Sequence, residues 1–192
     1  MAQKFQMESI TSLNTRNKNK KSVLSIREIC VFSMLGALMF ASKLLMEALP
    51  NIHLVGMFVM LTTVVFRKKA LVSIYLYVAL LGVYMGFSAW WVPNLYVWTI
   101  LWAMTMLLPK TLGVKWARIL YPCVCALHGL IFGIIYAPAQ ALLFGLDFNM
   151  TLAWIAAGFP WDCIHAAGNF IAGLMILPLS RLLTILKIRY RI

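Results

Sequence analysis

The sequence has few acidic residues, little charge of either sign and few cysteines. Only 5 of its 192 residues are Asp or Glu, and charged residues make up 11%, against about 25% in an ordinary soluble domain. This composition argues against a soluble globular fold. The 4 cysteines are too sparse for a secreted disulfide scaffold. The sequence also contains no glycine-rich P-loop motif, so we expect this chain not to bind ATP in that manner.

Apolar residues dominate instead, at 63% of the chain. The fold class that this predicts is an all-α membrane protein, and the chain has room for six spans of about 20 residues. We predict a bundle of six transmembrane helices formed by residues 25–192, preceded by a mobile cytoplasmic N-terminal tail at residues 1–24. The six apolar runs lie at 26–49, 52–66, 70–89, 95–108, 114–144, and from 150 past Pro178.

A net charge of +12 would suggest a nucleic-acid partner in a soluble protein, but the positions of the charges give another explanation. If six helices alternate in direction, every Lys and Arg except Lys43 lies on one side of the bundle. Cytoplasmic loops of membrane proteins carry such an excess of basic residues. We therefore predict a multi-pass protein of the cell membrane, with both termini cytoplasmic, the lipid bilayer as its surroundings and no nucleic-acid partner.

Polar groups at membrane depth cost several kcal/mol unless they are satisfied, so ionisable ones mark candidate functional sites. Here they gather in the outer half of the predicted bundle, whereas the inner half is nearly all aliphatic. This asymmetry predicts a pocket open to the outside, rather than a channel lined through its full depth or a carrier with its site at the midplane. The candidates from this argument are Lys43, Glu47, Asn51, His53, Tyr136, Gln140, Asp162 and His165.

Several candidates also have structural explanations. Lys43 and Glu47 are four residues apart, so they could form an ion pair with each other or contact a substrate. Asn51 and His53 could serve only as loop and cap residues. The aromatic residues between positions 90 and 98 suit an interfacial belt or a stacking surface for a ring-shaped ligand.

A polar stripe on the last predicted helix has two readings as well. Asp162, His165 and Asn169 share one face of that helix. They could contact a ligand, or they could hold the bundle together by hydrogen bonds between helices. Cys123 and Cys125 are a poor metal chelate, because their sulfurs point about 200° apart on a helix, and we predict no metal site.

Three pairs of small residues have the spacing that lets helices approach closely in lipid. The pairs are Gly82/Gly86, Gly129/Gly133 and Ala37/Ala41.

Three segments carry a family resemblance. Residues 37–41 are Ala-Leu-Met-Phe-Ala, residues 49–52 are Leu-Pro-Asn-Ile, and residues 158–170 are GFPWDCIHAAGNF. Together they resemble the substrate-binding S components of energy-coupling factor (ECF) vitamin transporters, which share an Ala-x-x-x-Ala motif and a Gly-x-Pro-Phe-Asp-x-x-His-x-x-Gly-Asn-Phe stretch. Trp161 departs from that stretch by replacing Phe.

The resemblance implies a function. Such a chain is not an enzyme and holds no cofactor; it binds a vitamin or related micronutrient from outside with high affinity. It associates with a transmembrane T component and two ATPase subunits, and topples in the bilayer to release its substrate. Ala37 and Ala41 are the implied docking residues for the T component. The implied substrate-binding residues, beyond those above, are Trp91, Asn94, Tyr96 and Trp161.

The ligand itself is less determined. The turn at residues 49–51 favours a cobalamin-type ligand, while flavin, folate, pantothenate and pyrimidine precursors remain open. Two other classes of protein also fit parts of the sequence. One is a structural subunit of a membrane complex. The other is an intramembrane protease, suggested by His165 and Asn169, although the single Glu47 does not supply the paired glutamates of such enzymes.

Overall fold

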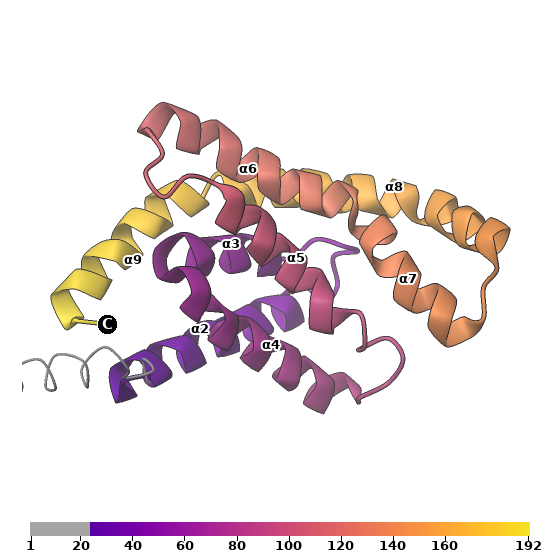
Figure 1. Ribbon diagram of the computed structural model, residues 1–192, viewed down its shortest axis with the longest axis horizontal. Coiled ribbons are helices and arrows are strands. Elements are labelled where there is room, and N and C mark those ends of the chain that lie inside the picture. Colours follow the sequence, from indigo (N-terminus) through magenta and orange to yellow (C-terminus); the bar gives the residue numbers. More distant parts are fainter. Residues whose placement is uncertain (1–23) are drawn as a thin grey trace, which may run out of the picture.

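The computed structural model describes residues 24–192, and the predicted tail lies outside that range apart from Leu24. Every regular element in this part of the chain is helical, which confirms the all-α prediction for it. Figure 1 shows the arrangement of the helices. They are α2 (Ile26–Leu45), α3 (Val55–Phe66), the 3-10 turn η1 (Arg67–Lys69), α4 (Ala70–Met85), α5 (Asn94–Leu107), α6 (Val114–Leu130), α7 (Phe132–Phe144), α8 (Phe148–Gly173) and α9 (Ile176–Tyr190).

Each of the six predicted helices corresponds to a helical segment, but some ends differ. Helix α2 ends at Leu45 rather than at residue 49. Helix α4 ends at Met85 rather than at residue 89, because Gly86 has a φ of 83° and terminates it. Only glycine adopts that conformation without strain.

The predicted fifth helix is broken into α6 and α7 at Ile131. The backbone N–H of Gly133 lies in the first turn of α7, where it has no acceptor within its own helix. It donates instead to Oδ2 of Asp162 on α8, at 3.1 Å. The carboxylate therefore caps the start of α7 from a neighbouring helix, where the helix dipole favours negative charge.

The predicted sixth helix is also divided, into α8 and α9, which meet at an angle of 47°. Pro178 has no N–H to donate to the carbonyl of Leu174, and its ring crowds that carbonyl. The break falls at Leu174 and Met175, as this rule requires. Pro160 lies inside α8 without ending it.

By length and apolarity, α2 and the stretch from α6 to α7 can each cross a membrane, and the bent pair α8–α9 makes a third span if it is counted as one. Helices α3, α4 and α5 have 12, 16 and 14 residues, against about 20 for a straight span. The part of the chain that the structure describes therefore has two to three helices of spanning length, which is compatible with a membrane protein.

Helix α3 lies in the middle of the molecule (Figure 1). All but one of its residues are buried, the exception being Val64. A helix that is apolar all round is expected in the core. The central position of α3 therefore agrees with its lack of a polar face.

Glycines mark the closest helix contacts. A Cβ on Gly129 of α6 would lie 3.0 Å from the Cα of Ala166 on α8, and one on Gly133 would collide with Asp162. The predicted close contact at this pair is therefore confirmed. The other glycine pair differs: Gly82 lies under Trp91, whose Nε1 would be 2.7 Å from an added Cβ, and Gly86 ends α4.

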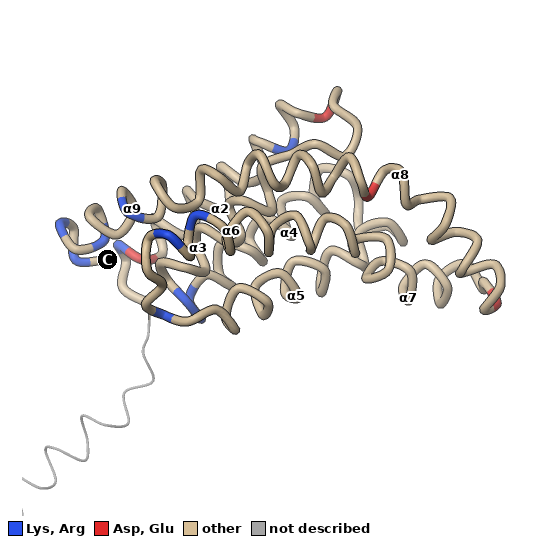
Figure 2. Tube along the Cα trace, turned by 90° about the horizontal axis from the view of Figure 1, so that it is seen from above, with Lys and Arg blue, Asp and Glu red and all other residues tan. Residues whose placement is uncertain are grey.

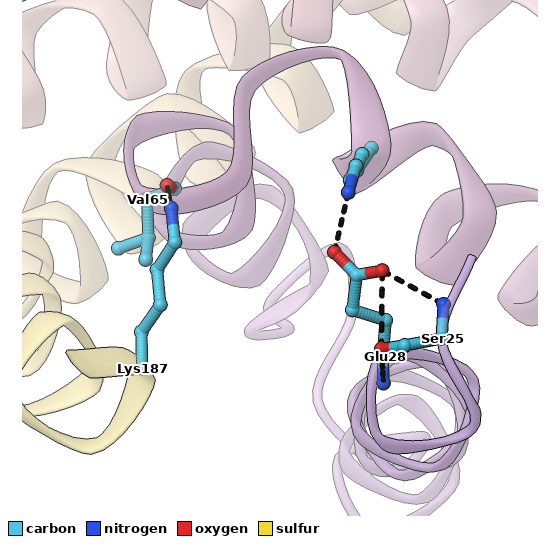
Figure 3. Close-up of polar contacts among 5 residues, drawn as sticks. Ser25, Glu28, Val65 and Lys187 are labelled. Carbon is cyan, nitrogen blue, oxygen red and sulfur yellow. Dashed lines mark hydrogen bonds and ion pairs between the residues drawn. The ribbon is translucent and has the colours of Figure 1, made fainter. Parts of the chain in front are cut away.

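Basic residues gather at one end of the molecule, where α9 ends and η1 lies, whereas one Lys lies apart beside the α2–α3 connection (Figure 2). Polar contacts tie this end together (Figure 3). Glu28 accepts hydrogen bonds from the backbone of Ser25 and from Lys69, and Lys187 Nζ donates to the carbonyl of Val65 at 2.9 Å.

Candidate ligand-binding site

A cavity of about 480 Å³ lies where the C-terminal ends of α2 and α4 meet α5, α7 and α8. Helices α2 and α4 both begin at the basic end, near Arg27 and Lys69, and run toward this cavity. The cavity is therefore at the end of these helices away from the basic residues. Its lining residues are Lys43, Asn51, His53, Tyr77, Leu81, Met85, Ser88, Trp90, Trp91, Asn94, Trp98, Phe132, Tyr136 and His165.

Two buried imidazoles line the cavity. His53 comes from the α2–α3 connection and His165 from the middle of α8, and their ring centroids are 4.9 Å apart. Their exposed fractions are 8% and 2%. Nδ1 of His53 and Nε2 of His165 have no hydrogen-bond partner in the protein. A buried polar atom without a partner costs about 1–3 kcal/mol, so these two atoms are suited to a partner from outside the chain.

Aromatic rings form the walls around the imidazoles. Phe132 lies 4.9 Å from His165, and Trp98 lies 5.8 Å from His53, both as ring-centroid distances. Tyr136 stacks on Phe132 at 5.9 Å. Such faces suit a planar ring, since aromatic pairs prefer centroid separations of about 4.5–7 Å.

Hydrogen bonds anchor the loop between α4 and α5, which contributes residues to the cavity lining. Tyr136 donates its hydroxyl to the carbonyl of Trp90 at 2.9 Å, and Trp91 Nε1 donates to the carbonyl of Val78 at 2.8 Å. The side chain of Asn94 accepts from Trp98 Nε1 at 3.0 Å and donates to Trp90 at 3.3 Å. The loop between α4 and α5 is thus anchored to α4, α5 and α7.

Lys43 is the one charged side chain among the lining residues. Within residues 24–192 the structure contains a single ion pair, between Lys69 and Glu28, so Lys43 is not paired with Glu47. A neutral imidazole, such as that of His53 beside Lys43 in the lining, has one nitrogen to donate and one to accept.

The cavity brings together seven of the twelve predicted substrate-binding residues. These are Lys43, Asn51, His53, Trp91, Asn94, Tyr136 and His165. They come from positions up to 122 residues apart in the sequence numbering, from Lys43 to His165. Their role in binding stays a prediction.

The other five predicted residues lie elsewhere. Tyr96 donates to the carbonyl of Ile135 at 2.9 Å, and Asp162 caps α7. Gln140 is buried in α7 but does not line the cavity. Glu47 and Trp161 are exposed on the outside of the molecule.

The polar stripe on α8 is divided between two roles. Asp162 and Asn169 bond to α7 and α6, the latter through Nδ2 to the carbonyl of Cys125 at 3.2 Å. His165 between them faces the cavity. The hydrogen-bonding interpretation is confirmed for Asp162 and Asn169, and a ligand contact by His165 stays a prediction.

Sequence reasoning missed the wall that α4 contributes. Tyr77, Leu81 and Met85 recur every four residues and all line the cavity. That spacing places them on one helix face, but the whole of α4 is apolar, so nothing singled out this face. Ser88 was missed too, because it lies in a connection that was predicted as helix.

Among the described residues, no three His, Cys, Asp or Glu side chains are arranged to hold a metal ion. The third histidine, His128, lies beside Trp98 at 5.8 Å, and its Nε2 is 3.1 Å from the carbonyl of Val97. It does not line the cavity.

No protein-family model, curated protein or solved structure matches this chain.

Proposed function

We propose that this chain is a six-span membrane protein, with both termini cytoplasmic, that binds a vitamin or related micronutrient as the substrate-binding subunit of an ATP-driven uptake system. The observation that carries the proposal is the cavity itself. Two buried imidazoles with unpartnered nitrogens and an unpaired lysine converge there among aromatic walls. A site of this kind, apolar with a few convergent polar groups, is typical of small-molecule binding.

The charge distribution supports the orientation. Basic residues mark the cytoplasmic side of membrane proteins, and they gather at one end of the molecule (Figure 2). The cavity lies at the opposite ends of α2 and α4, so it faces outward in this topology. Helices α3, α4 and α5 are each shorter than a straight span. The six-span arrangement therefore requires the segments that connect them to cross the remaining thickness of the bilayer.

The chemistry of the cavity indicates the kind of ligand. Its rings suit a planar heterocycle, the imidazoles suit hydrogen bonds to ring or amide atoms, and Lys43 suits a carboxylate or phosphate. The volume of about 480 Å³ is in the lower half of the range of about 300–1,000 Å³ for drug-sized ligands. We therefore favour a compact ring-bearing vitamin over the cobalamin-type ligand suggested by the turn at residues 49–51.

The outer face of α2 supports the proposed partner. Ala37 and Ala41 are exposed, whereas Gly36 on the other side of the helix packs against α4, where an added Cβ would lie 2.8 Å from the carbonyl of Ser73. A smooth, exposed stripe permits close approach of another helix in lipid. We propose that it docks on a T component that works with two ATPase subunits.

We propose no catalytic activity for the chain. The described part of the chain places no carboxylate in the cavity lining, and Asn169 is bonded to α6 beneath it. Peptide hydrolysis would need a general base beside the attacking water. Glu47, the candidate for the glutamate base of the intramembrane protease class, is exposed on the outside.

The first experiment is to purify the full chain in mild detergent after growth with a vitamin mixture, denature it and identify released molecules by mass spectrometry. We expect one small molecule in stoichiometric amount. Its absence, together with no change in tryptophan fluorescence when each vitamin is added, would reject the binding function and favour a structural subunit.

A further inference from the structure

A second and larger hollow lies at the basic end, far from the cavity described above. This groove of about 870 Å³ runs between the first turns of α2 and the last turns of α9. Its apolar walls include Ile26, Met34 and Leu183. Ile26 and Met34 are 81% and 70% exposed, so the groove is an uncovered apolar surface.

Three arginines border this apolar groove. They are Arg27 from α2, and Arg189 and Arg191 from the end of α9. Arg27 Nη1 donates to the carbonyl of Tyr190 at 3.2 Å, which joins the two helices at this point. The guanidinium of Arg189 lies 5.8 Å from the ring centroid of Tyr190.

Within residues 24–192, no acidic side chain pairs with the arginines of this border. Glu28 is the one acidic side chain that the described part of the chain places at this end (Figure 2). Its carboxylate accepts hydrogen bonds from Ser25 and Lys69 rather than from an arginine of the groove (Figure 3). Among residues 24–192 no ion pair joins any of the three arginines to a carboxylate, the chain-terminal one included. Whatever fills the groove must therefore be apolar along its length and anionic at one end.

We propose that this groove binds one anionic phospholipid, with an acyl chain along the apolar walls and its phosphate at the three arginines. Basic pockets between helices on the cytoplasmic side of membrane proteins bind such headgroups. The chain's own N-terminal segment fits less well, since residues 1–23 carry Lys4, Arg16, Lys18, Lys20 and Lys21 against a single acidic residue, and would be repelled. The proposal goes beyond the vitamin site, and depends only on the membrane setting.

The test uses the full chain purified in mild detergent and given an equimolar mixture of phosphatidylglycerol and phosphatidylcholine. Native mass spectrometry then counts the lipids that each variant retains. We expect the wild-type chain to retain one phosphatidylglycerol in preference to phosphatidylcholine. The combined variant Arg27→Gln, Arg189→Gln, Arg191→Gln should retain about a hundredfold less, since each of the three basic residues near the anionic headgroup contributes about fivefold.

A matched control removes equal charge from exposed positions outside the groove, with Lys115→Gln, Arg118→Gln and Arg181→Gln. It should retain phosphatidylglycerol as the wild type does. Equal loss in both variants would show a general charge effect and overturn the proposal, and so would equal retention of the two lipids by the wild type.

Two further variants test the shape of the groove. Cys30→Trp and Met34→Trp fill it without changing charge, and each should lower phosphatidylglycerol retention. Unchanged retention in both would overturn the placement of the acyl chain. Deletion of residues 1–23 should leave retention unchanged; increased retention would show that this segment occupies the groove instead.

Discussion

At the scale of single residues, the chain tolerates unpartnered polar atoms where a ligand would supply the partner. Nδ1 of His53 and Nε2 of His165 are buried without hydrogen bonds. Neighbouring polar side chains in the same bundle do find partners, as Asp162 and Asn94 do. Asn94 lines the cavity as well, and buried atoms outside the lining, such as Nδ1 of His128 and Oδ1 of Asn169, also lack partners. The contrast that matters is therefore within the lining, between the partnered amide of Asn94 and the unpartnered nitrogens of the two histidines.

This contrast predicts opposite effects of one substitution. His165→Phe removes the unpartnered nitrogen and keeps a ring of similar shape, so the free chain should gain about 1 kcal/mol of unfolding free energy. The same change removes a hydrogen bond to the ligand and should weaken binding about tenfold. Thermal unfolding in detergent and titration of tryptophan fluorescence measure the two effects.

Trp161→Phe is the matched control, because Trp161 is on the same helix but exposed. It should change neither quantity. Destabilisation of the free chain by His165→Phe, with ligand affinity intact, would assign His165 a structural role.

At the scale of elements, the helix ends are determined by contacts between helices as much as by local sequence. The break between α6 and α7 depends on Asp162, which is 29 residues away from the Gly133 N–H that it accepts. No local pattern at Ile131 signals it. The break between α8 and α9, in contrast, lies one turn before Pro178, where a local rule accounts for it. The prediction of a single helix past Pro178 was wrong, and Pro160 shows that a proline alone does not decide where a helix ends.

The contact between α7 and α8 gives a prediction with its own control. Gly133→Ala should destabilise the chain by about 1–3 kcal/mol, because the new Cβ collides with Asp162 in a packed interior. Gly158→Ala, on α8, meets no atom within 4 Å and should stabilise by about 0.5–1 kcal/mol through its better helix propensity. Thermal unfolding midpoints of both variants check this; equal shifts would argue against the cap.

The exposed stripe on α2 gives a second prediction at this scale. Ala37→Trp or Ala41→Trp should abolish uptake and recovery of the T component and ATPase subunits by co-purification, while ligand binding to the isolated chain stays unchanged. Ile171→Trp, at another exposed position, on α8, should affect neither. Normal uptake in both alanine variants would remove α2 as the docking face.

At the scale of the whole molecule, the apolar runs predicted where the helices lie and the charges predicted the basic end. The sequence alone also nominated seven residues that now line one cavity. It did not nominate Tyr77, Leu81 and Met85, because α4 is uniformly apolar and only the fold shows which face meets the cavity. Tyr96 was nominated by the family resemblance and Asp162 for its chemistry, but both side chains already form hydrogen bonds with backbone groups of α7.

The proposed topology can be checked with single cysteines in a chain whose four native cysteines are replaced. Ser88→Cys, in the exposed connection between α4 and α5, should react with a membrane-impermeant maleimide on intact cells. Lys110→Cys, in the connection between α5 and α6, should react only after the membrane is permeabilised. Labelling of both on intact cells would rule out a six-span arrangement of this orientation.

The gathering of histidines has a practical consequence for spectroscopy. The chain has 3 histidines, and aromatic contacts link all of them to Trp98, Phe132 or each other. Isotope labelling of histidine alone would therefore give a magnetic resonance spectrum with signals only from this site and the residues beneath it. In a protein of this hydrophobicity, where crowded spectra are the main obstacle, each added compound could be followed at the imidazole nitrogens without assigning any other part of the chain.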